Sequence, residues 1–245
     1  MLIPASPEEL RNLNALTDKL VLALEPYVGY IRVTHPGQKR PNNGTGVVVN
    51  APDAPGGAVV LSARHVAEDA GFKYEHDILI PLGPRDGEGV FLARKCRIKP
   101  YSIHAHLDLA SFIFEDYVPV HKWEGIKKPP AGENSGHALA FGFATRDADW
   151  ESQKENFDVS IGTTAFLLRT ISYGADIAQL ELNVPHKHGS YPGLSGAPVW
   201  QFSAVEDGLK PHLAGLVKGM AAGQTDITMH CVHQLKPDGK WLFSA

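Results

Sequence analysis

Apolar residues near the start of the chain recur at intervals of three or four residues. This spacing places five leucines on one face of a helix: Leu10, Leu13, Leu16, Leu20 and Leu24. Ser6 is a suitable N-cap, Pro7 suits the first helical position, and Glu9 completes a capping box. The pattern predicts a short N-terminal helix that ends before Pro26 and packs against the body of the protein.

From residue 29 onward, short runs of valine, isoleucine and aromatic residues are bounded by Gly, Pro and Asn, which is typical of short β-strands. The pattern predicts twelve strands, at residues 30–34, 44–50, 58–63, 77–81, 90–98, 110–115, 137–143, 165–170, 179–183, 197–201, 212–218 and 227–232. So many strands with almost no helix favour an antiparallel sandwich or barrel arrangement. A polar, proline-bearing stretch between residues 118 and 136 predicts a linker between two halves.

The composition is that of a globular protein with a sizeable core, because 43% of the 245 residues are hydrophobic and 20% are charged. The net charge of −4 gives no reason to expect nucleic acid or an anionic membrane as a partner. Residues 1–25 lack the basic start and continuous apolar run of a signal peptide, so we expect a soluble, cytoplasmic protein. We expect Cys96 and Cys231 to be buried thiols, and a disulfide between them is the alternative.

Candidate chemistry begins with a serine on a glycine-flanked turn, Gly193-Leu194-Ser195-Gly196, directly before a predicted strand. Such a turn presents a nucleophile, and the N–H groups of Gly193 and Ser195 can point at one spot, an oxyanion hole. A plain loop between strands is the alternative that this motif alone leaves open. A serine hydroxyl needs a base to take its proton and a third group to orient that base.

Two upstream residues fit those roles. His65 follows the predicted strand at 58–63, and Asp108 lies just before the strand at 110–115. Two other histidine pairs, at 104/106 and 186/188, have a spacing that places both rings on one strand face, as a metal would require. Neither pair has an obvious Cys, Asp or Glu partner set, so we expect no metal site.

The order His65, Asp108, Ser195, together with the surrounding motifs, resembles the trypsin-like, two-barrel serine peptidases, especially the bacterial HtrA-type branch. The resemblance covers roughly residues 28–235. The segments that carry it are Gly-Thr-Gly at 44–46, Leu-Ser-Ala-Arg-His-Val at 61–66, Asp-Leu-Ala at 108–110, residues 138–142, and Pro-Gly-Leu-Ser-Gly-Ala-Pro at 192–198. The α/β-hydrolase alternative needs the order serine, acid, histidine, which is not found here.

The resemblance implies an all-β fold of two six-stranded antiparallel β-barrels, chymotrypsin-like, with a short N-terminal helix. We accordingly expect a helix over residues 1–26, a first barrel over 27–118, a linker over 119–136 and a second barrel over 137–245. The resemblance also implies a serine endopeptidase that works through a covalent acyl-enzyme and needs no cofactor. Ser195 would attack the peptide carbonyl, His65 would take and return the proton, and Asp108 would orient the histidine.

In the resemblance, the substrate pocket is walled by residues 188–192, 217–220 and 227–232. It therefore predicts substrate-binding roles for five residues, Gly189, Lys218, Gly219, Met220 and His230. No acid stands at the base of this pocket, so a preference for Arg or Lys is poorly supported. The expected binding partner is a protein or peptide substrate.

The chain departs from the family pattern just before the nucleophile. Many trypsin relatives carry an aspartate there, which pairs with a newly cut N-terminus, and Leu194 cannot make that ion pair. We hypothesise that the loop at 189–195 samples an inactive conformation, and that a substrate or an activating protein partner selects the active one. The alternative from another class is a catalytically silent trypsin-like domain that binds peptides or acts as a scaffold.

Overall fold

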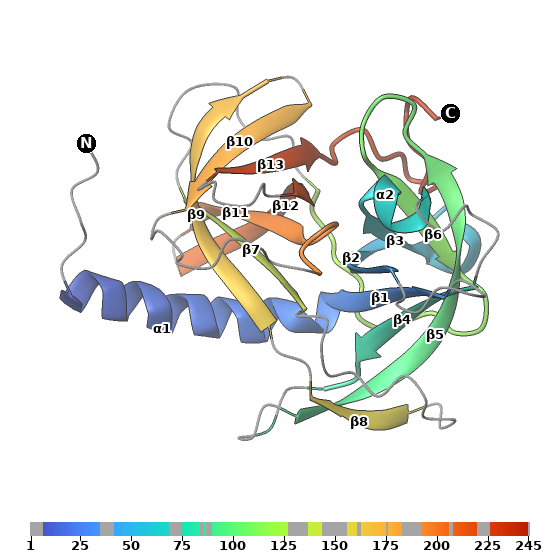
Figure 1. Ribbon diagram of the computed structural model, residues 1–245, viewed down its shortest axis with the longest axis horizontal. Helices are drawn as coiled ribbons and strands as arrows, with labels where there is room; N and C mark the ends of the chain where they lie inside the picture. Colours follow the sequence, from blue (N-terminus) through green and yellow to red (C-terminus); the bar gives the residue numbers. More distant parts are fainter. Residues whose placement is uncertain are drawn as a thin grey trace.

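A computed structural model describes residues 7–34, 42–68, 75–83, 86, 90–126, 137–143, 156–160, 163–174, 176–182, 193–205, 208–219 and 226–244. Two antiparallel sheets lie side by side, and helix α1 (Pro7–Leu24) runs beneath the second sheet and leads into the first strand (Figure 1). As predicted, α1 begins at Pro7 and ends before Pro26, which lies in the short 3₁₀ turn η1 (Glu25–Tyr27). No helix within the described ranges is long and apolar enough to cross a bilayer.

The first sheet contains seven strands. Their bounds are β1 (Val28–Thr34), β2 (Asn42–Asn50), β3 (Ala58–Ser62), β4 (Glu75–Pro81), β5 (Val90–Ile103), β6 (Ala110–Phe114) and β8 (Asn156–Ser160). The spatial order is β4-β1-β2-β3-β6-β5-β8, and β4 also pairs with β5. Because β4 pairs with β5, the six strands from β4 to β5 curl into a ring of paired strands. Strand β8 pairs with β5 outside this ring. A second 3₁₀ turn, η2 (Pro55–Gly57), precedes β3, and the five-residue helix α2 (Arg64–Glu68) follows it.

The second sheet is a closed six-stranded barrel. Its strands are β7 (His137–Phe143), β9 (Thr163–Tyr173), β10 (Ile177–Leu182), β11 (Pro198–Val205), β12 (Gly208–Gly219) and β13 (Asp226–Cys231). They are hydrogen-bonded in the order β10-β13-β12-β11-β7-β9. The prediction of an all-β fold with two antiparallel barrels and a short N-terminal helix is confirmed.

Strand β8 was not predicted, and it connects the two halves of the chain. It follows β7 in the sequence, yet it pairs with the start of β5, from Val90 opposite Ser160 to Arg94 opposite Asn156. A segment of five residues carries too little alternation to stand out, and this one is a strand because a partner distant in sequence supplies its hydrogen bonds. The predicted domain bounds stay a prediction.

The core is continuous between the two sheets. All five residues of β3 are buried, and the indole of Trp200 on β11 lies 4.6 Å, ring centre to ring centre, from that of Trp123 in the connecting segment. Trp123 in turn exchanges backbone hydrogen bonds with β2, donating to Val48 and accepting from Asn50. Cys96 and Cys231 are buried free thiols, as expected.

Candidate active site

The register of the first sheet explains why His65 and Asp108 meet. On neighbouring strands β3 and β6, Ser62 lies directly opposite Ala110. His65 comes three residues after Ser62, in α2, and Asp108 comes two residues before Ala110. Both residues therefore leave the sheet at the same end, although they are far apart in the sequence.

Asp108 binds His65 with both carboxylate oxygens. Oδ2 lies 2.6 Å from Nδ1 of the ring, and Oδ1 accepts the backbone N–H of His65 at 2.9 Å. Burial alone would raise the pKa of Asp108, but the two hydrogen bonds from His65, together with the charges of His65 and His230, outweigh it and hold the pKa below its ordinary value. The ionised carboxylate can only accept, so the ring hydrogen lies on Nδ1 and the lone pair on Nε2. The side chain of His65 is 37% exposed, which leaves it accessible.

The turn that carries Ser195 is fixed by both sheets. Gly193 and Gly196 have φ of +94° and +80°, which favours glycine at both positions. The Ala197 N–H donates to the Leu194 carbonyl at 2.9 Å and closes the turn. The turn is held from β2 of the other half, because the Thr45 hydroxyl donates to the Gly193 carbonyl at 2.6 Å and the Thr45 N–H donates to the Ser195 carbonyl at 2.9 Å.

This turn and Val66, the residue after His65, both approach Gly44 of β2. A β-carbon built on Gly44 would lie 2.7 Å from the Val66 side chain and 3.0 Å from the Ser195 carbonyl oxygen, so both neighbours approach the same point. The Ser195 hydroxyl makes no hydrogen bond to another described residue. No hydrogen bond therefore joins Ser195 to His65 here, which is common in unliganded sites, where such bonds tighten on substrate binding.

The backbone donors expected at an oxyanion hole have no partner among the described residues. Neither the Gly193 N–H nor the Ser195 N–H donates to a residue that the structure describes. By contrast, the Gly196 and Ala197 amides of the same turn donate to the Val217 and Leu194 carbonyls. Two backbone donors without an acceptor, one of them on the candidate serine and the other two residues before it, are suited to hold a developing oxyanion.

Thr45 is a functional candidate whose role the sequence did not indicate, although Gly-Thr-Gly at 44–46 was noted. Its hydroxyl also accepts the Phe143 N–H at 3.3 Å, so it links the two sheets at the turn. We expect Thr45→Val to lower the free energy of unfolding by about 1–3 kcal/mol, because it leaves the buried Gly193 carbonyl without its donor. We expect Thr45→Ser, which keeps the hydroxyl, to remain near wild type. Denaturant unfolding of both variants is the test, and equal stability of the two would contradict the structural role.

The structure describes three of the five predicted substrate-binding residues, Lys218, Gly219 and His230. Gly189 and Met220 lie outside the described residues, whereas Lys218 is exposed and Gly219 half-buried at the end of β12. His230 is buried on β13, where its Nδ1 accepts the Asp108 N–H at 2.9 Å, so it lies beside the candidate aspartate. The substrate-binding roles of these residues stay predictions.

The structure also places one of the two histidine pairs considered for a metal. His104 is buried, its Nδ1 accepts two backbone N–H groups, and its Nε2 lies 2.7 Å from the side-chain oxygen of Gln234. Both ring nitrogens are thus used within the protein. The described part of the chain contains no group of three or more potential metal ligands. The second pair, at 186/188, lies outside it.

Burial of His230 predicts a pH-dependent stability. Burial, reinforced by the charges of Lys218 and His104 and opposed by that of Asp108, lowers the pKa of His230 from 6.5 to about 4. Between these values the unfolded chain binds a proton that the folded protein does not, so stability falls as the pH falls from 6.5 to 4. The full shift corresponds to about 3 kcal/mol, which solvent screening near the accessible His65–Asp108 pair reduces to about 2 kcal/mol. Denaturant unfolding from pH 8 to 4 measures it, and a profile that His230→Asn does not flatten would contradict the assignment.

Comparison with known proteins identifies the fold. No family model matches the sequence, and no curated protein matches it either. Among solved structures, the active form of the Rv3671c protease from M. tuberculosis gives a TM-score of 0.54 at 16% identity, over 89% of this chain and 82% of that chain. An inactive serine-to-alanine mutant of Rv3671c from M. tuberculosis H37Rv gives 0.53 at 15% identity, over 95% and 92%. Deg5 gives 0.54 at 14% identity, over 92% and 91%. The chain therefore has the two-barrel fold of trypsin-like serine peptidases.

Proposed function

We propose that the protein is a serine endopeptidase that uses Ser195, His65 and Asp108. The observation that carries this proposal is the doubly hydrogen-bonded His65–Asp108 pair, together with a turn that packs on Ser62 and Ala63, just before His65 in the sequence. The Gly193 and Ser195 amides of this turn have no acceptor in the described part of the chain. The likeness of the fold to the Rv3671c protease supports the same class of reaction.

In this mechanism, Ser195 Oγ attacks the carbonyl carbon of a peptide bond, and His65 Nε2 takes the hydroxyl proton. The Gly193 and Ser195 amides stabilise the negative oxygen of the tetrahedral intermediate. His65 then gives the proton to the leaving amine, which leaves an acyl group on Ser195. Water, deprotonated by the same nitrogen, hydrolyses the acyl-enzyme. Asp108 remains ionised throughout and stabilises the charged form of His65.

The substrate class is a protein or peptide, and no cofactor takes part in the steps above. The hypothesis of an inactive loop concerns residues 189–195, of which the structure describes only the last three. Because Leu194 cannot make the ion pair that the resemblance implies for this loop, an activating protein partner is part of the proposal. It predicts that turnover of a small peptide rises when the partner is added.

A fluorophosphonate probe, followed by mass spectrometry of the modified peptide, tests the proposal. Labelling at Ser195 is expected, and cleavage-site profiling would then define the substrate preference. The second candidate is a catalytically silent peptide-binding or scaffolding module, the alternative from another class that the sequence left open. A folded sample that the probe does not label, and that still binds peptides, would support this candidate and overturn the first.

A further inference from the structure

The short loop that carries Asp108 is held by two buried histidines from different sheets. His104, at the end of β5, accepts the N–H groups of His106 and Leu107 on its Nδ1, both at 3.1 Å. His230, on β13 of the second barrel, accepts the Asp108 N–H on its Nδ1 at 2.9 Å. Three consecutive backbone donors therefore end on two imidazole rings.

We propose that His104 and His230 are positioning residues for Asp108, which they hold by accepting these three amide hydrogens. The inference rests on the proposed function, because it assigns Asp108 the task of orienting His65. Neither histidine touches the reacting atoms. Their effect on the reaction passes through the position of the Asp108 carboxylate.

The loop is closed at its base, where the His104 N–H donates to the Leu109 carbonyl at 3.0 Å, and the side chains of Leu107 and Leu109 are buried. Residues 105–109 form no strand, and within the loop the Leu109 N–H donates to the Leu107 carbonyl at 2.9 Å. Asp108 must nevertheless keep both of its oxygens on His65, at 2.6 and 2.9 Å. Catalytic groups need to be held within about 0.5 Å of their productive geometry, and side-chain acceptors from two rigid strands can supply that constraint.

The protonation state of His104 is set by its partners. Because Nδ1 accepts hydrogen bonds, the neutral ring carries its hydrogen on Nε2, which can donate to the side-chain oxygen of Gln234 at 2.7 Å. The side-chain NH₂ of Gln234 in turn donates to the Asp176 carboxylate. In this chain of contacts Gln234 accepts from Nε2 of His104 through its side-chain oxygen and donates to Asp176 through its NH₂ group. The acceptor nitrogen of His104, Nδ1, therefore faces the loop that carries Asp108.

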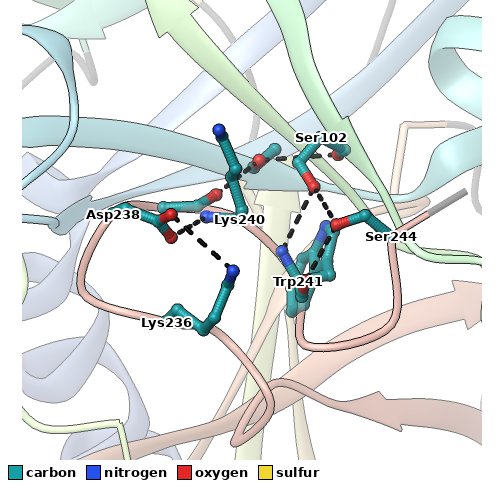
Figure 2. Close-up of polar contacts among 8 residues, drawn as sticks. Ser102, Lys236, Asp238, Lys240, Trp241 and Ser244 are labelled. Atoms are coloured by element: carbon teal, nitrogen blue, oxygen red, sulfur yellow. Dashed lines mark hydrogen bonds and ion pairs between the residues drawn. The ribbon is translucent and has the colours of Figure 1, made fainter.

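The C-terminal segment supports His104 from the other side. As Figure 2 shows, the Ser102 hydroxyl, two residues before His104, accepts the Trp241 N–H at 3.2 Å and lies 2.9 Å from the Ser244 hydroxyl. The Ala105 N–H, one residue after His104, donates to the Phe243 carbonyl at 2.7 Å. The last residues of the chain thus fix the end of β5 from which the loop begins.

The first test examines the unmodified protein by ¹⁵N NMR of its histidine rings at pH 7. We expect both His104 and His230 to be neutral, with hydrogen on Nε2 and an Nδ1 that accepts hydrogen bonds. A hydrogen on Nδ1 of either ring would overturn the proposal. This measurement needs no variant and no enzymatic activity, so it tests the positioning role of the two histidines even where a substitution prevents folding.

The second test compares His230→Leu, which removes the acceptor, with His230→Asn, whose side-chain oxygen can replace Nδ1. The readouts are the downfield NMR signal of the His65 Nδ1 hydrogen and the rate of fluorophosphonate labelling at Ser195. We expect His230→Leu to lose the signal and to label about 10- to 100-fold more slowly, the range that small misplacements cost. We expect His230→Asn to keep the signal and to label within about threefold of wild type.

The matched control is His212→Leu, since His212 is also buried but bonds the Ser203 hydroxyl on β11. It is expected to change neither readout. If His230→Leu keeps both the signal and the wild-type labelling rate, the positioning role is wrong and the peptidase stands. If wild type is not labelled, the proposed function fails, while the NMR signal still decides whether His230 holds Asp108.

Discussion

Replacing Ser195 by alanine is expected to lower kcat/KM on peptide substrates by about 10⁴-fold or more, because the proposed mechanism forms the acyl-enzyme on the Ser195 hydroxyl. The free energy of unfolding should stay within about 0.5 kcal/mol of wild type. The Ser195 hydroxyl makes no hydrogen bond to a described residue, so its removal leaves no buried donor or acceptor unpaired. The activity of purified wild type and variant on a peptide library, together with denaturant unfolding, measures both effects.

The two readouts separate chemistry from folding. A variant that loses activity and stability together would indicate that the hydroxyl supports the turn, and the nucleophile would then remain unassigned. A variant that keeps wild-type turnover would place the nucleophile elsewhere in the chain. Fluorophosphonate labelling of the variant offers an independent check, since the modified peptide that contains residue 195 should disappear.

The candidate site could be predicted from the sequence only as far as local motifs reach. His65 and Asp108 were found because each lies at the end of an apolar strand-like run, and strands β3 and β6 do pair at those ends. The contact of His230 with Asp108 has no such signature. It joins residues 122 positions apart, and any buried histidine on a strand would look the same in the sequence.

The fold was similarly predictable where the pattern was local. The sequence of helix α1 offers a candidate cap, a proline at the first position and regular leucine spacing, and the helix ends before Pro26 as predicted. Strand β5 runs on to Ile103, five residues beyond its predicted end, through the proline at 100. Its pairing with β6 shifts register between Pro100 and Ser102, and such an irregularity accommodates a residue without an N–H.

Gly196 is the position where a single methyl group is expected to damage the structure most. A β-carbon built there would lie 2.2 Å from the Ser62 hydroxyl, 2.3 Å from the Thr45 carbonyl oxygen and 2.7 Å from the Ala63 nitrogen. Two of these three atoms belong to the backbone, so they cannot move aside without displacing β2 or the end of β3. The φ of +80° adds a further cost of about 1 kcal/mol for any residue with a side chain.

We therefore expect Gly196→Ala to lower the free energy of unfolding by about 3–5 kcal/mol, which is at the upper end for a single substitution. Gly83→Ala is the matched control, because a β-carbon there meets nothing within 4 Å, and its effect should stay within about 0.5 kcal/mol. Because the displaced turn carries Ser195, the folded fraction of Gly196→Ala should also label at least about 100-fold more slowly with a fluorophosphonate. Equal unfolding midpoints for the two variants would mean that the turn does not pack on Ser62 and Ala63 in solution, and the proposed pairing of Ser195 with His65 would lose its structural basis.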